Sequence, residues 1–217
     1  MVLYLLASLP IVFSLVVLLP WDARRVPQTI SLVSTFTRGA LIFLPAFLVM
    51  LIARRIFGFS FNGFFLYLSL LLRDHLVPLL LGTGGFLLVQ QKLDFPGTEE
   101  GVFLAVFSFL AGFLSLANIA DLVAGWGRWD AHVLFLLPSL RIVAALFVAL
   151  SAQRFFRWEG RDGLSFCGIS ALVAGLAALS SFVFRINRAG LSALLAAGAA
   201  AGALVLIALR FPRVLKG

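Results

Sequence analysis

From residue 102 to residue 125 the chain reads VFLAVFSFLAGFLSLANIADLVAG, an apolar run whose one charged side chain is Asp121. A helix needs roughly 20 such residues to cross the ~30 Å hydrocarbon core of a bilayer. A segment in lipid must also satisfy its backbone hydrogen bonds internally, which a helix does. The run therefore predicts a transmembrane helix.

Runs of this kind recur along most of the 217 residues, which are 62% hydrophobic with a mean hydropathy of +1.11. The other runs cover residues 2–19, 32–53, 56–91, 132–150, 164–184 and 189–209. We therefore predict one transmembrane domain over residues 1–217, an all-α polytopic membrane protein. The expected bundle has seven transmembrane helices, or eight if residues 56–91 cross twice.

Residues 56–91 are the difficult segment, because a single helix of this length would extend roughly 54 Å at 1.5 Å per residue. We expect it to be broken by Arg73-Asp74-His75 and then by Pro78, and to be loosened again by the sequence GTGG at 82–85. One crossing could end near His75, two short crossings could meet at this triplet, or one broken helix could hold it inside the bilayer. The last solution implies a site, since irregular backbone at that depth needs cover from protein.

The charges argue for a membrane protein and against a nucleic-acid-binding one. The formal net charge is +8, yet basic residues stand mainly as pairs at the ends of apolar runs, which suits headgroup anchoring. The pairs are Arg24-Arg25, Arg54-Arg55, Arg185 with Arg188, and Arg210 with Arg213. The positive-inside rule favours seven crossings with the N-terminus outside. We expect an integral protein of the bacterial inner (cytoplasmic) membrane, with the lipid bilayer as its partner.

An internal repeat is also predicted. Sliding the chain against itself by 131 positions aligns three consecutive apolar runs and places Arg54 on Arg185. Residues 2–6, VLYLL, then fall on residues 133–137, VLFLL. The candidate halves are 1–78 and 132–209, each a triple-helix unit, with a linker region at 79–131.

Small residues in the last run predict close helix packing there. Gly198 and Gly202 form a small-xxx-small pair, which lets two backbones approach closely in a membrane.

Several short motifs give the chain a resemblance to a transporter family. Gln153 follows the fifth predicted helix, basic residues come next, and the sequence GLSF at 163–166 opens another helix. Pro27-Gln28 stands in the first half. With these features the chain resembles the PQ-loop and SWEET transporters. The resemblance implies three helices, one linking helix, three more helices, and transport of a small solute.

Arg141 is the best candidate for a functional charge, because it lies midway along an apolar run. A charge near the bilayer centre costs at least ~2.5 kcal/mol and should be paired or line a cavity. The preceding run places Ser108, Ser115, Asn118 and Asp121 roughly on one helical face. We predict that Ser115, Asn118, Asp121 and Arg141 line a substrate or ion pathway. A structural ion pair between two helices is the alternative.

Arg73, Asp74 and His75 are candidates for gating or proton coupling, with a turn or interfacial cluster as the alternative. Successive residues of a helix turn by 100°, so at most two of the three point inward. His75 titrates near neutral pH, and Asp74 could hold its tautomer.

Enzyme motifs are scarce. The sequence contains two histidines and neither an HExxH nor a GxSxG motif, so we expect no enzymatic activity, cofactor or metal. The leading hypothesis is a small-solute transporter or solute-binding bundle. One alternative is a seven-helix sensor or accessory subunit that acts through a separate partner chain. Another is a membrane-embedded hydrolase, which requires Asp74, His75 and Asp121 to converge in one cavity. As partners we also consider a second copy in a homo-oligomer, or a membrane or cytosolic subunit.

Overall fold

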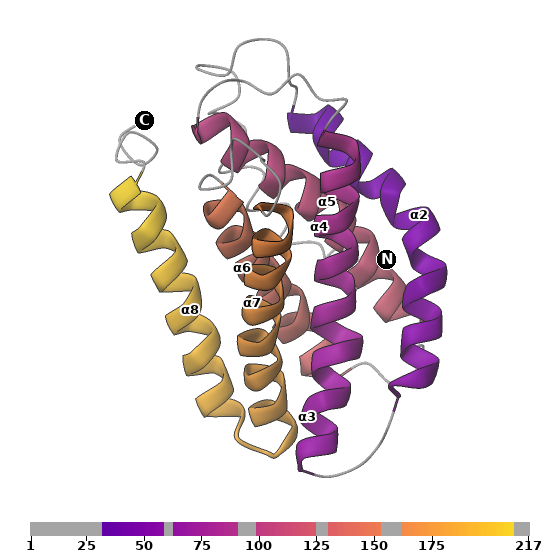
Figure 1. The fold of residues 1–217 in the computed structure, drawn as a ribbon. Coiled ribbons are helices and arrows are strands. Elements are labelled where there is room, and N and C mark those ends of the chain that lie inside the picture. The colour runs from indigo at the N-terminus through magenta and orange to yellow at the C-terminus, as the bar shows by residue number, and fades with distance from the viewer. Residues whose placement is uncertain (1–31, 59–62, 91–98, 125–129, 153–161, 211–217) are drawn as a thin grey trace.

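The computed structural model describes residues 32–58, 63–90, 99–124, 130–152 and 162–210. Within these ranges the regular elements are all helical, which confirms the predicted all-α class. In chain order they are α2 (Leu32–Ile56), α3 (Phe64–Leu70), η1 (Leu71–Leu76), α4 (Val77–Gln90), α5 (Glu99–Ala124), η2 (His132–Leu136), α6 (Leu137–Ala152), α7 (Asp162–Arg185) and α8 (Ala189–Arg210). The two η elements are π-helical turns that lead directly into the next α-helix, η1 into α4 and η2 into α6. Figure 1 shows the helices gathered into one elongated bundle.

Six of the described helices are long and apolar enough to cross a membrane. These spans are Leu32–Ile56, Phe64–Val89, Gly101–Ala124, His132–Ala152, Ser165–Arg185 and Ala189–Ile207. They fit an integral membrane protein and agree with six of the predicted runs. The seventh predicted helix, at residues 2–19, lies outside the described residues.

The segment from 56 to 91 forms one candidate span rather than two. Helix continues from Phe64 through η1 and past Pro78 to Gln90, so the expected break at Pro78 is wrong. The wider π-helical turn accommodates the proline, because Val77 donates its N–H to the carbonyl of Leu72, five residues back. Of the three solutions, the structure is closest to the one that holds Arg73-Asp74-His75 inside a single crossing.

The glycine-rich sequence at 82–85 packs the helix instead of loosening it. A Cβ added to Gly82 would lie 3.0 Å from Leu110 of α5, and one added to Gly85 would lie 2.6 Å from Ile42 of α2. These glycines therefore let α4 approach both neighbours. Residue 78, the end of the first candidate repeat half, lies inside α4, and the repeat itself stays a prediction.

Helix α5 forms the core of the bundle, packed against α2, α4 and α6. Of its apolar span 83% is buried, against 17% for α8. Phenylalanines at 103, 107, 109 and 113 lie fully inside, and Phe86 of α4 meets Phe109 edge to face. Their burial fixes α5 as the helix against which the others are placed.

The closest helix contact is between α2 and α5. A Cβ at Gly39 would overlap the backbone carbonyl of Phe109, and one at Gly112 would overlap that of Phe36. The two backbones touch because neither glycine has a side chain, which is how membrane helices associate without a hydrophobic drive.

The described residues do not show the close packing predicted at Gly198 and Gly202. A Cβ at either position would meet no atom of the described chain within 4 Å. Helix α8 leans away from α6 and α7 toward its C-terminal end, as Figure 1 shows. An apolar cavity of about 850 Å³ lies between these three helices, lined by Phe147, Leu176 and Leu206 among others.

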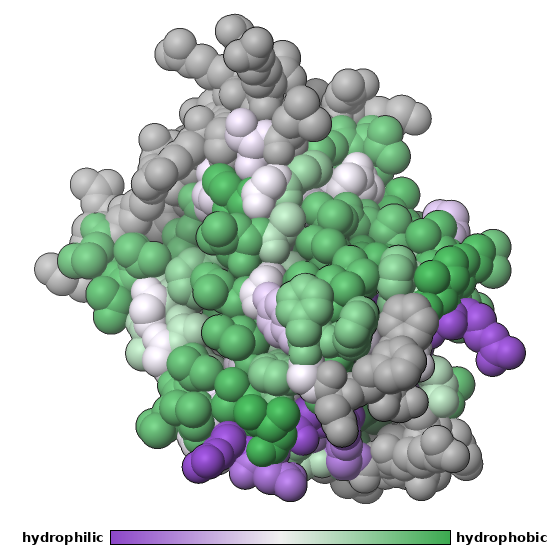
Figure 2. Space-filling view, turned by 60° about the horizontal axis from the view of Figure 1, so that its bottom comes forward, coloured by the Kyte–Doolittle hydropathy of each residue, from purple (hydrophilic) through white to green (hydrophobic). Residues whose placement is uncertain are grey.

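Charged residues meet at one end of the bundle. Side-chain contacts join Arg54 to Asp121 and Arg185 to Asp130, which brings together the last turns of α2, α5 and α7 and the start of η2. We call this the Arg54 end, defined by these four residues. Figure 2 brings the lower end of the bundle forward, where hydrophilic residues gather below a largely hydrophobic surface.

Candidate functional site

The guanidinium of Arg141 is buried between three helices. The residue is 2% exposed and lies nine positions after the start of its span at His132, about 13 Å along the helix. Helical side chains lean toward the N-terminus, so Arg141 reaches back toward the Arg54 end. Its Nη1 donates to Oδ1 of Asn118 at 2.7 Å and to Oδ2 of Asp121 at 2.5 Å. The structure thus brings together three of the four predicted pathway residues.

The other partner of Arg141 is a main-chain group. Its Nε and Nη2 donate to the carbonyl oxygen of Asp74, at 3.1 and 2.8 Å. In a regular α-helix this oxygen would accept from the N–H of residue 78, but Pro78 has none. The proline therefore leaves an acceptor inside the membrane span, and the guanidinium of Arg141 satisfies it.

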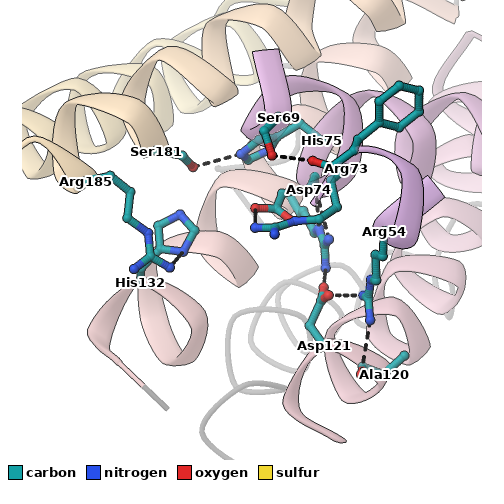
Figure 3. Close-up of polar contacts among 12 residues, drawn as sticks. Arg54, Ser69, Arg73, Asp74, His75, Ala120, Asp121, His132, Ser181 and Arg185 are labelled. Atoms are coloured by element: carbon teal, nitrogen blue, oxygen red, sulfur yellow. Dashed lines mark hydrogen bonds and ion pairs between the residues drawn. The ribbon is translucent and has the colours of Figure 1, made fainter. Parts of the chain in front are cut away.

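Asp121 connects Arg141 to a residue that the sequence analysis missed. One carboxylate oxygen accepts from Arg141, and the other accepts from Nη2 of Arg54. Arg54 also donates to the carbonyl of Ala120 at 3.4 Å, as Figure 3 shows. The sequence did carry a signal: consecutive antiparallel crossings place the end of α2 and the end of α5 on the same side of the membrane. The position of Arg54 at the end of an apolar run predicts only a headgroup anchor.

The carboxylate of Asp74 pairs with its own neighbour. Arg73 donates from Nε and Nη2 to the two carboxylate oxygens at 2.6 and 2.9 Å, a bidentate pair. The side chain of Arg73 is 31% exposed and that of Asp74 is 6% exposed. Asp74 and His75 are buried while Arg73 is partly exposed, in agreement with the expectation that at most two of the triplet point inward.

His75 faces another helix. Its Nε2 lies 2.8 Å from the hydroxyl of Ser181 on α7, and both residues are buried. Asp74 binds Arg73 instead of His75 in the described contacts, so the expected tautomer-holding pair is wrong here. Asp74, His75 and Asp121 thus point to three different sets of partners.

A second histidine lies closer to the Arg54 end. His132 is 1% exposed, its Nδ1 lies 3.5 Å from Nη2 of Arg185, and its ring stacks obliquely on Phe184. Arg185 also pairs with Asp130 at 2.7 Å, and Asp130 accepts from the N–H of Val133 at the start of η2. The Nε2 of His132 has no partner in the described chain.

Ser115 does not join the site. Its hydroxyl donates to the carbonyl of Ala111, one turn back in the same helix, at 2.7 Å. Ser108, on the same predicted face, instead ties α5 to the carbonyl of Leu32 at 2.7 Å. The polar face of α5 therefore narrows to Asn118 and Asp121 at its Arg54 end.

We call the resulting set of side chains the charged cluster. Its members are Arg54, Arg73, Asp74, Asn118, Asp121 and Arg141. Among the described residues it combines three guanidinium groups with two carboxylates. It draws its side chains from four elements, α2, η1, α5 and α6.

The charged cluster and the apolar cavity are separate features. The cavity between α6, α7 and α8 is lined by none of the cluster residues, and its polar walls are limited to Ser151 and Ser180. The described residues also contain no grouping of three or more His, Cys, Asp or Glu that could hold a metal ion. What the cluster offers chemically is fixed positive charge and hydrogen-bond donors.

Comparison with protein-family models, with curated proteins and with solved structures finds no match to this chain. The resemblance to PQ-loop and SWEET transporters therefore stays an expectation, and most of its loop motif, residues 153–161, lies outside the described residues.

Proposed function

We propose that this protein is a membrane-embedded bundle that binds and carries a small solute, with the charged cluster as its binding site. Six helices of membrane-spanning length provide the setting. The observation that carries the proposal is the burial of Arg141 inside one of them, held by groups from α5 and η1. Charges inside membrane spans commonly mark substrate or ion pathways.

Stability alone is a poor reason for such a cluster. Desolvating a buried ion pair costs about as much as the pairing returns, and apolar replacements of both partners are often neutral or stabilising. The cluster also places a π-helical turn beside the charge, and such turns are frequent at functional sites. A binding role accounts for both features.

The arrangement also supports a mechanism for carrying. Asp121 is shared by Arg54 on α2 and Arg141 on α6, so a solute that replaces this carboxylate on either arginine alters a contact between helices. A change in those contacts favours whichever arrangement of the bundle binds the solute better. Binding is thereby coupled to the packing of α2 and α5 against α6.

The test is electrical or tracer flux in proteoliposomes made with the full chain, over a panel of small anions, cations and neutral solutes. We expect saturable flux of at least one solute, and its loss in Arg141→Gln and Asp121→Asn. Arg55→Gln is the matched control, because Arg55 neighbours Arg54 but is exposed. Folded protein without flux of any solute, or flux unchanged in both cluster variants, contradicts the proposal.

A further inference from the structure

We infer that the charged cluster recognises an oxyanion, a carboxylate or phosphate group, on the ligand it binds. This inference rests on the proposed function and names the substrate class for the same site. Three independent features of the cluster lead to it: its charge balance, its unused donors and its gradient of exposure.

The charge balance favours an anion. Arg54, Arg73 and Arg141 carry three positive charges against two negative charges on Asp74 and Asp121. Away from water, an uncompensated charge is costly. A ligand with one negative charge would neutralise the excess.

The unused hydrogen-bonding groups are donors. Asn118 is 3% exposed, and its Oδ1 accepts from Arg141, which fixes the amide orientation and makes Nδ2 the remaining donor. This Nδ2 has no partner in the described chain. It lies on the same amide group as Oδ1, and so beside the guanidinium of Arg141.

Arg54 adds more donors. A guanidinium has five N–H groups, and the contacts of Arg54 in the described chain are one to Ala120 and one to Asp121. The ionised oxygens of carboxylates and phosphates accept hydrogen bonds, and arginine binds them in bidentate fashion. Excess positive charge suits an anionic group better than a cation. A set of unpaired donors also suits it better than a hydroxylated solute, which needs hydrogen-bond acceptors as well.

The exposure of the cluster indicates how a ligand would approach. The exposed fraction of the side chains falls from 31% at Arg73 through 14% at Arg54 to 3% at Arg141. Asp121, at 12%, lies between the last two and holds the place an incoming anion would take. We expect the anion to pass Arg73, whose guanidinium is held by Asp74, and to displace the carboxylate of Asp121 from Arg54.

The experiment measures equilibrium binding of radiolabelled inorganic phosphate and acetate to the full chain in uncharged detergent micelles, with labelled choline as the cationic comparison. We expect saturable binding of phosphate or acetate and none of choline. Loss of a charge-assisted hydrogen bond should weaken binding about ten- to a hundredfold in Arg54→Gln. Arg55→Gln should bind as the wild type does.

A second variant protects the test against misfolding. Asn118→Asp removes the unpartnered donor and the excess charge while keeping an acceptor for Arg141, so it should fold and lose anion binding. If folded wild type binds neither anion saturably, or if folded Asn118→Asp and Arg54→Gln both bind as the wild type does, the inference is overturned.

Two sources of the anionic group are distinguished in nanodiscs of phosphatidylcholine and of phosphatidylglycerol. Equal binding of phosphate or acetate in both identifies a free solute, and binding lost only in phosphatidylglycerol identifies a lipid headgroup. Failure of this inference differs from failure of the proposed function. Anion binding without flux would support the anion site and contradict the carrier function. Flux of a cation without anion binding would support the carrier function and contradict the anion site.

Discussion

Arg141 binds the main-chain carbonyl of Asp74, and the carboxylate of the same residue binds Arg73. The buried Arg141 thus does not pair with the carboxylate of Asp74 in η1. Its carboxylate partner is Asp121 of α5, whose Oδ2 lies 2.5 Å from Nη1. This division assigns separate structural tasks to the two aspartates.

The first prediction concerns the pair of Arg141 and Asp121. Arg141→Leu removes one partner of a buried network and should lower the free energy of unfolding in detergent by about 3 kcal/mol. Arg141→Leu combined with Asp121→Leu should cost more than the single change, because Arg54 then also loses its carboxylate partner. Chemical denaturation of the two variants tests this, and a double variant more stable than Arg141→Leu would contradict it.

The second prediction concerns Pro78. Pro78→Ala restores an N–H four residues after Asp74, so the carbonyl acquires a partner within its own helix. The stabilising contribution of Arg141 should then fall, giving a coupling of about 1 kcal/mol between positions 78 and 141. A double-mutant cycle with Arg141→Gln measures it, and additive effects would show that the proline does not create the acceptor.

The third prediction concerns the crossing of α2 and α5. Gly112→Ala places a methyl group into the backbone of Phe36 and should destabilise the fold by about 2 kcal/mol or more. Gly198→Ala, where an added Cβ meets open space, serves as the control and should be neutral or stabilising by about 0.5 kcal/mol. Thermal unfolding in detergent compares them, and equal effects would argue against the close contact.

The fourth prediction concerns His75. Ser181→Ala removes the hydrogen-bond partner that the buried Nε2 of His75 has in the described chain, and should cost about 1–3 kcal/mol. Ser139→Ala is the control, because the Ser139 hydroxyl makes an exposed hydrogen bond to the carbonyl of Phe135, four residues earlier in the same span. Its effect should stay within about 0.5 kcal/mol. Similar losses for both serines would mean that the contact with His75 contributes nothing specific.

The helical class and most helix boundaries could be predicted from sequence because each apolar run carries its own length signal. The grouping of Asn118, Asp121 and Arg141 was equally accessible, since a hairpin of two adjacent runs fixes which depths meet. Both predictions rest on local order along the chain.

Contacts between helices distant in sequence could not be predicted in this way. The pair of His75 and Ser181 joins positions 106 apart, and its existence depends on which helices are neighbours in the bundle. The same holds for Gly39 against Phe109, because hydropathy does not distinguish a glycine in a helix crossing from one facing open space. The π-helical turn before Pro78 was missed for another reason: the proline suggested a break, whereas a change of helical winding absorbs it.

The main-chain acceptor of Arg141 has a consequence for genetics. Since every amino acid at position 74 supplies a carbonyl, replacing Asp74 tests only its contact with Arg73, and leaves the group that Arg141 binds in place. Whether this carbonyl is free to accept from Arg141 depends instead on residue 78, because Pro78 lacks the N–H that would otherwise bind it. A mutational scan would therefore attribute to a proline, whose side chain makes no polar contact, a phenotype that belongs to an arginine on another helix.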